Sequence, residues 1–151
     1  MAYEAEIFSG KVLRQGANGR ASGADGWILE GIDWAMRNQC QIISMSLGAP
    51  VNSSSFPTSY ERAAQRGLQA GILIIAATGN DSERRKGFIA PVGRPANCPS
   101  IAAVGAIDVQ NLIADFSNGQ KFGNGGEVNF VGPGVDVLSS CLLYTSPSPR
   151  D

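Results

Sequence analysis

Apolar residues in this chain follow two spacings, one typical of buried strands and the other typical of amphipathic helices. Apolar runs at residues 5–13, 41–47 and 72–77 predict three strands. Between them, residues 24–38 and 59–70 place apolar side chains three or four positions apart, which predicts two helices. The predicted order is therefore strand, helix, strand, helix, strand.

The first predicted helix shows the helical spacing most clearly. Its apolar side chains recur at i, i+4, i+7 and i+8, and they are Ile28, Ile32, Ala35 and Met36. Ser22 and Asp25 stand three residues apart around the expected start of this helix. We therefore expect them to cap it.

A βαβαβ order predicts an α/β fold. Right-handed crossovers would place helices on both faces of a doubly wound, mostly parallel sheet and align the carboxyl ends of its strands along one edge. The continuous apolar run 72–77 is typical of a strand that is covered on both faces. Residues 81–99 then show little periodicity, and further strand-like pieces are expected at residues 100–107, 114–116, 128–131 and 135–138.

Length and charge exclude several classes of protein. The 151 residues, 43% of them hydrophobic and 17% charged, suit one globular domain or part of one. A net charge of −1 without a block of like charges gives no footprint for nucleic acid or an anionic membrane surface. No apolar stretch approaches the roughly 20 residues that span a bilayer, and the first residues lack the layout of a signal peptide.

Cysteine and histidine usage narrows the chemistry further. Cys40, Cys98 and Cys141 are odd in number and lack metal-ligand spacing, so we expect buried or free thiols rather than disulfides or a zinc site. The chain contains no histidine. It therefore has neither an ordinary Ser-His or Cys-His pair nor the commonest metal ligand.

The last residues differ from the rest. The stretch "CLLYTSPSPRD", residues 141–151, resembles the translated read-through of a sequencing adapter, and a natural Pro/Ser-rich linker is the alternative. We expect the native reading to end near Ser140.

Polar residues follow the strand predicted at residues 72–77. Thr78, Gly79 and Asn80 would place an amide side chain off the carboxyl end of that strand, where open α/β sheets bind ligands. A simpler interpretation is that Asn80 is a turn residue, because Asn tolerates left-handed conformations.

An ordered set of motifs extends over residues 5–140. These motifs are "KVL" (11–13), "GIDWA" (31–35), "SMSLGAP" (44–50), "AATGN" (76–80), "VGRP" (92–95), "CPSIAAVGA" (98–106) and "VGPGVDV" (131–137). Together, and in this order, they resemble the subtilisin-like serine proteases, the subtilase or peptidase S8 family. Residues 1–140 are thus expected to be part of such a catalytic domain, with residues 141–151 outside it.

The resemblance implies roles for residues at the strand ends. Asn80 matches the asparagine that donates its side-chain amide to the oxyanion, a charge that exists only around the transition state. Other matched residues would contact the substrate backbone or form the pocket for the residue before the scissile bond, with Gly93 at its floor and Asp81 near its rim. These residues are Ser22, Gly23, Ser46, Leu47, Gly48, Ala76, Ala77, Thr78, Gly79, Asp81 and Gly93, while Val92 and Arg94 flank Gly93 in the pocket wall.

Two further features follow from the resemblance alone. The Arg94-Pro95 bond matches one that is often cis in the family. Backbone carbonyls and two side chains resemble a weak cation site for calcium or a monovalent ion, with the residues Ala96, Cys98, Ile101, Glu127 and Asn129. Asn129 stands where a carboxylate is usual, so calcium affinity should be reduced. No cofactor is expected to be required.

The departures from the family concern the catalytic triad. The family's aspartate and histidine match no residue here, and no "GTSMA"-type serine motif is present. We therefore expect an internal fragment of a secreted serine endopeptidase that acts on peptides or proteins, inactive as it stands and of open oligomeric state.

Two other classes of protein share features with this sequence. A nucleotide-binding Rossmann-like domain would share the βαβαβ order but needs a G-x-G-x-x-G turn after its first strand, and "RQGANGRASG" lacks it. A degenerate protease homologue that binds peptides without cleaving them remains open, because loss of catalytic residues would look much like truncation.

Overall fold

The computed structural model describes residues 4–16, 21–51, 53–121 and 123–138. The stretch 141–151 and Cys141 lie outside the described residues, so the expectations for them are not addressed by the structure.

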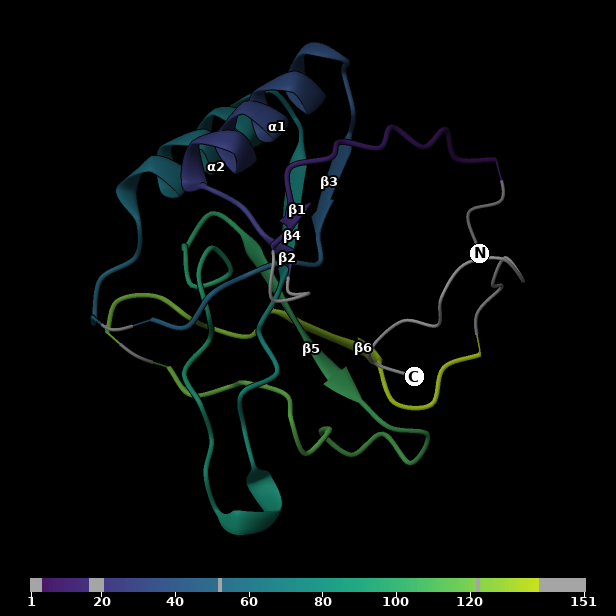
Figure 1. The fold of residues 1–151 in the computed structure, drawn as a ribbon, viewed down its shortest axis with the longest axis vertical. Coiled ribbons are helices and arrows are strands. Elements are labelled where there is room, and N and C mark those ends of the chain that lie inside the picture. Colours follow the sequence, from purple (N-terminus) through teal and green to yellow (C-terminus); the bar gives the residue numbers. More distant parts are fainter. Residues whose placement is uncertain (1–3, 17–20, 52, 122, 139–151) are drawn as a thin grey trace.

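A four-stranded parallel sheet forms the centre of the chain (Figure 1). Its strands are β3 (Ile42–Met45), β4 (Leu73–Ala77), β5 (Ala102–Ile107) and β6 (Phe130–Pro133), in the spatial order β3-β4-β5-β6. Each neighbouring pair is parallel. The α/β class with parallel strands is therefore confirmed.

Two helices pack beside each other on one face of this sheet (Figure 1). They are α1 (Asp25–Arg37) and α2 (Thr58–Gln69). Ile28, Ile32 and Ala35 of α1 are buried, which confirms the apolar face expected from their spacing. A short 3-10 helix, η1 (Arg84–Lys86), lies in the irregular stretch after β4. No helix among these described elements is long and apolar enough to cross a membrane.

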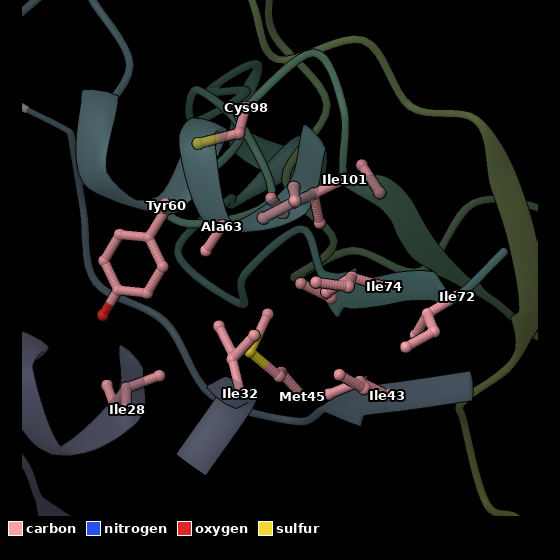
Figure 2. Close-up of a cluster of buried hydrophobic side chains, with 14 of the residues drawn as sticks. Ile28, Ile32, Ile43, Met45, Tyr60, Ala63, Ile72, Ile74, Cys98 and Ile101 are labelled. Atoms are coloured by element: carbon pink, nitrogen blue, oxygen red, sulfur yellow. The ribbon is translucent and has the colours of Figure 1, made fainter. Parts of the chain in front are cut away.

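The hydrophobic core lies between these helices and the sheet. Figure 2 shows side chains of both helices, β3 and β4 converging with Cys98 and Ile101 from the loop before β5. Tyr60 of α2 is only 2% exposed although its hydroxyl reaches out of the core to Asp25. This packing fixes the helices over β3 and β4 and holds the carboxyl ends of those strands in place.

The opposite face of the sheet is open in the described residues. Side chains of β3 alternate between exposed and buried, and Ile42 is 61% exposed. In β4, Leu73 is 40% exposed although the run 72–77 is apolar throughout. The described α-helices thus cover one face, where the sequence pattern predicts cover on both.

Four of the predicted strands are absent, shifted or interrupted. Residues 5–13 form no strand, and Ile7 is 88% exposed, because no described strand pairs with them. A two-residue antiparallel pair follows instead, between β1 (Arg14–Gln15) and β2 (Ala21–Ser22).

Near the carboxyl end of the chain, the piece expected at 128–131 becomes β6, shifted by two residues. Residues 114–116 form no strand. An isolated bridge joins Ile113 to Ile107, and the Ala114 amide donates to the Ala106 carbonyl, while the carbonyls of Asp115 and Phe116 accept bonds from the Arg84 and Ser82 amides. Residues 135–138 are interrupted at Asp136, whose φ of 52° is incompatible with extended backbone.

The predicted cap of α1 is also wrong. Ala24 occupies the N-cap position, and no side chain caps the helix. The Asp25 carboxylate instead accepts hydrogen bonds from the Tyr60 hydroxyl at 3.1 Å and from Arg94 at 2.7 Å. Asp25 therefore links the start of α1 to α2 and to the loop around residue 94.

The two described cysteines, Cys40 and Cys98, are free, as expected. Burial, with a smaller contribution from the nearby Glu61 carboxylate, raises the pKa of the Cys98 thiol to about 12. At neutral pH this thiol is therefore protonated and unreactive.

Candidate active site

The candidate site lies where β3 and β4 end. Their parallel register pairs Met45 with Ala76, so the segments that follow both strands leave the sheet at the same edge. Ser46 begins one of these segments and Thr78 the other. Two segments that begin 32 residues apart in sequence are thus brought side by side, as the order of the motifs predicts.

A pocket of about 170 Å³ lies between these two segments. Asn80 is exposed and lines it, and it also lines a second hollow of about 150 Å³ toward β5 and β6. The first pocket gathers most of the residues that the resemblance assigns to substrate contact, namely Ser46, Leu47, Gly48, Ala77, Gly79, Asp81 and Gly93.

The resemblance also assigns Thr78 and Ala76 to substrate contact, but neither lines this pocket. Thr78 is 2% exposed, and it contributes through its backbone carbonyl, which accepts a hydrogen bond from the Gly93 amide at 2.8 Å. Ala76 is 3% exposed and belongs to the core. Its side chain faces the helices, so it is not one of the residues that face the cleft.

The pocket walls are joined by backbone hydrogen bonds. Ala49 and Arg94 exchange a pair of bonds, each of 2.9 Å, which ties the segment after β3 to the loop after residue 91. A Cβ atom at Gly48 would lie 2.9 Å from the Arg94 carbonyl oxygen, and one at Gly93 would lie 3.0 Å from that of Ala49. These glycines therefore allow two backbones to approach closely. The resemblance places Gly93 at the pocket floor but does not predict this backbone contact.

A second cavity, of about 350 Å³, lies on the other side of the segment after β3. Ser22 and Gly23 line it together with Ser46, Leu47 and Gly48, so the two segments expected to sandwich a substrate face one space.

Arg94 lines this second cavity and does not line the pocket beside Asn80 where its side chain was expected. With Asp25 and Tyr60 it gives the cavity a polar wall. Burial and the Asp25 carboxylate raise the pKa of Tyr60 above its ordinary value, so its hydroxyl stays a hydrogen-bond donor.

The turn that carries Asn80 depends on Gly79 and on a residue that the sequence did not single out. Gly79 has a φ of +108°, a region open mainly to glycine. A Cβ there would lie 2.5 Å from the side-chain nitrogen of Asn118. Asn118 is 2% exposed and makes hydrogen bonds with the residues on both sides of Asn80. It follows the strand-like piece predicted at residues 114–116, and neither spacing nor a motif indicates its role.

The Arg94-Pro95 bond is cis, as the resemblance implies.

The residues of the expected cation site are largely committed to other partners. The Asn129 side-chain oxygen accepts a hydrogen bond from the Ala103 amide at 2.7 Å, and the Cys98 carbonyl accepts one from the Ile101 amide. Glu127 pairs with Lys121, whose hydrogen bond and charge lower the pKa of that carboxyl. In the described part of the chain no three His, Cys, Asp or Glu residues gather as a metal group. The donor set fits a cation poorly, and the site stays a prediction.

Comparison with known proteins identifies the family. The sequence model of the Subtilase family matches residues 1–151. The chain belongs to the subtilase family. It is 36% identical to Subtilisin E of Bacillus subtilis over 140 residues, which covers 93% of this chain and 33% of that protein. It is also 35% identical to the Major intracellular serine protease of the same organism over 140 residues, 93% of this chain and 40% of that protein.

Solved structures of the same fold include proteases and a macrocyclase. The prenylagaramide maturation protease PagA is 31% identical with a TM-score of 0.66, covering 80% of this chain and 41% of that one. The PatG macrocyclase in complex with peptide is 25% identical with a TM-score of 0.61, covering 75% and 32%. The subtilase chain described here thus spans less than half the length of these relatives.

Proposed function

We propose that this subtilase chain supplies the oxyanion donor and the substrate cleft of a serine-type endopeptidase. The observation that carries the proposal is the position of Asn80, exposed at the carboxyl end of β4 where it lines two adjoining pockets. Because the sequence holds no histidine, the proton-transferring base must lie outside it. The nucleophilic serine and the aspartate of the triad are assigned to the same full-length protease.

The cleft suggests how a peptide is held. A substrate strand that pairs with the backbone of Ser46 to Gly48 would have the pocket beside Asn80 on one side and the cavity beside Ser22 on the other. Attack of a serine on the peptide carbonyl places negative charge on its oxygen. The Asn80 amide is neutral and directional, so it would stabilise that charge without a proton transfer.

A peptide-binding homologue without catalysis is the second candidate. The same cleft would hold a peptide whether or not a triad completes it, since backbone pairing needs none of the catalytic side chains. The two candidates differ in whether the full-length protein turns over a bound peptide.

The site is proposed to act in a secreted protein, on peptide or protein substrates. The relatives include one named as an extracellular protease and one named as an intracellular protease, so the family alone does not fix the compartment. No partner beyond the substrate is proposed.

Asn80→Ala in the full-length protease tests the proposal. A contact made only in the transition state affects turnover rather than ground-state binding, so kcat should fall while KM barely moves. The expected loss in kcat is on the order of 10² to 10³-fold, a magnitude carried over from the oxyanion asparagine of subtilisin itself rather than derived for this chain. Steady-state kinetics on a chromogenic peptide measure both constants.

Asn80→Asp serves as the charge control. It should be no better than Asn80→Ala, because a carboxylate repels the charge that the amide stabilises. An unchanged kcat together with a lower melting temperature would show that Asn80 is a turn former. A full-length protein that binds peptide, cleaves none and is not labelled by a serine-directed inhibitor would favour the peptide-binding homologue.

A further inference from the structure

We infer that Asn118 is a positioning residue for Asn80, which it holds from both sides; the inference rests on the proposed function. The Asn118 backbone amide donates to the Gly79 carbonyl at 3.1 Å. Its side-chain Oδ1 accepts from the Asp81 amide at 2.7 Å. Both neighbours of Asn80 are thus hydrogen-bonded to Asn118. Gly79 is bonded to its backbone amide, and Asp81 is bonded to its buried side chain.

The Asn118 side chain uses its full hydrogen-bonding capacity. Oδ1 also accepts from the Ser82 hydroxyl at 3.2 Å, and Nδ2 donates to Asp81 Oδ2 at 2.9 Å and to the Pro91 carbonyl at 3.0 Å. A backbone amide can only donate and a carbonyl can only accept, so the partners fix the orientation of the Asn118 amide. At 2% exposure these bonds face little competition from water.

The network joins the oxyanion turn to the rest of the cleft. Pro91 begins the loop that continues to Gly93 in the pocket wall, and the Ser82 hydroxyl accepts a bond from the Ala90 amide at 2.9 Å. Asn118 therefore connects the turn that carries Asn80 to the wall of the pocket in which the substrate side chain would lie. Displacement of a catalytic donor by about 1 Å can cost about 10²-fold in rate.

The turn that carries Asn80 packs closely against Asn118. Gly79 backs onto Asn118 so tightly that a Cβ at Gly79 would lie 2.5 Å from Nδ2. Asn118→Ala would leave the Asp81 amide and the Pro91 carbonyl without their partner and would open space behind Gly79. The Asn80 amide would then sample positions in which it no longer meets the oxyanion.

A double-mutant cycle in the full-length protease tests the inference. Asn118→Ala should lower kcat by about 10- to 100-fold with little change in KM. In an Asn80→Ala background the same change should alter kcat by no more than about 2-fold, because Asn118 acts through Asn80. A structural role alone would give the same loss in both backgrounds and would overturn the inference.

Asn97→Ala is the matched control. Asn97 is also a buried asparagine, 5% exposed, but its Oδ1 has no hydrogen-bond partner among the described residues. Its removal should leave kcat and KM unchanged. An equal loss from Asn97→Ala and Asn118→Ala would show that any buried asparagine here acts through general packing, which overturns the inference.

A second variant covers the case in which Asn118→Ala does not accumulate. Asn118→Asp keeps the acceptor for the Asp81 amide but loses both Nδ2 donors and adds a charge beside the Asp81 carboxylate. It should lower kcat, and adding Asp81→Asn should recover part of the loss by removing the repulsion and supplying a donor. No recovery would overturn the inference. A silent Asn80→Ala would instead overturn the proposed function, and the inference with it.

Discussion

Gly79 shows at the scale of one residue why the turn that carries Asn80 has its sequence. Its φ of +108° is strained for any residue with a Cβ, and a Cβ would also press on Asn118. Gly71 has a φ of +75°, and a Cβ added there would meet no atom within 4 Å, so it carries the backbone requirement alone. The two positions therefore differ in contact and also in backbone conformation, because +108° lies farther than +75° from the left-handed region that residues with a Cβ adopt.

We expect Gly79→Ala to lower the free energy of unfolding by about 2–3 kcal/mol, against about 1 kcal/mol for Gly71→Ala. Urea unfolding of the full-length protease, with its serine blocked by an inhibitor to prevent autolysis, measures both. The larger cost at Gly79 would come from the contact with Asn118 together with a φ farther from the left-handed region. Equal costs at the two positions would contradict the close packing behind the turn.

Asn80 and Asn118 also show what the sequence can predict. Asn80 follows an apolar strand within a motif, so its place at a sheet edge follows from the pattern, and its proposed role comes from the resemblance. Asn118 lies 37 residues from its partner Asp81, outside every motif of the resemblance. Its role depends on a tertiary contact, and no local signal predicts such a contact.

At the scale of elements, α2 holds the loop that leads into β5. Glu61 of α2 accepts bonds from the backbone amide and the hydroxyl of Ser100, at 3.0 Å and 2.6 Å. Cys98 donates from its thiol to the carbonyl of Pro57, which precedes α2, at 3.7 Å. The helix thereby fixes the loop that runs from the pocket wall to the next strand.

This junction predicts a loss of stability at alkaline pH. Burial raises the Cys98 pKa from its ordinary 9.0 to about 12 in the folded state. Because folding raises this pKa, the contribution of the Cys98 thiol to the free energy of unfolding is complete below about pH 9. It is lost as the pH rises from about 9 toward 12. Unfolding at a series of pH values should show this decline, and Cys98→Val should reduce its slope.

Thiol labelling gives an independent measurement of the same junction. The raised pKa lowers the thiolate fraction of Cys98 at pH 8 by on the order of 10³-fold relative to an ordinary thiol. Cys40 is partly exposed and serves as the internal reference. Rapid labelling of Cys98 in the folded protein would show that the junction opens readily.

The elements themselves were predicted unevenly, for physical reasons. Both helices and β3 to β5 follow from spacing, because their apolar faces are buried by local neighbours. Residues 5–13 carry a strand-like pattern, but a strand also needs a hydrogen-bonded neighbour, and the described residues supply none. Pattern predicts which residues can form a strand, whereas pairing decides whether they do.

At the scale of the whole molecule, one face of the sheet is unfinished. Three large apolar side chains lie exposed on the face away from the helices, and they are Ile42 (61%), Leu73 (40%) and Phe130 (59%). Large apolar side chains gathered on one open sheet face are unusual on a stable monomer. Removing it from water requires further protein, because both described α-helices already pack on the opposite face.

The chain of 151 residues by itself is therefore expected to fold poorly and to hydrolyse no peptide above background. Without histidine it has no triad base, and the exposed sheet face should bind a hydrophobic dye such as ANS. The full-length protease should bind less dye per molecule and should turn over a chromogenic peptide. Dye fluorescence and peptide turnover, measured on the chain and on the full-length protease, distinguish the exposed sheet face from the missing triad. Asn80→Ala in the full-length protein is the control, because it should lower turnover without exposing the sheet face. Turnover by the purified chain that a serine-directed inhibitor abolishes would contradict the assignment of the triad to other parts of the protease.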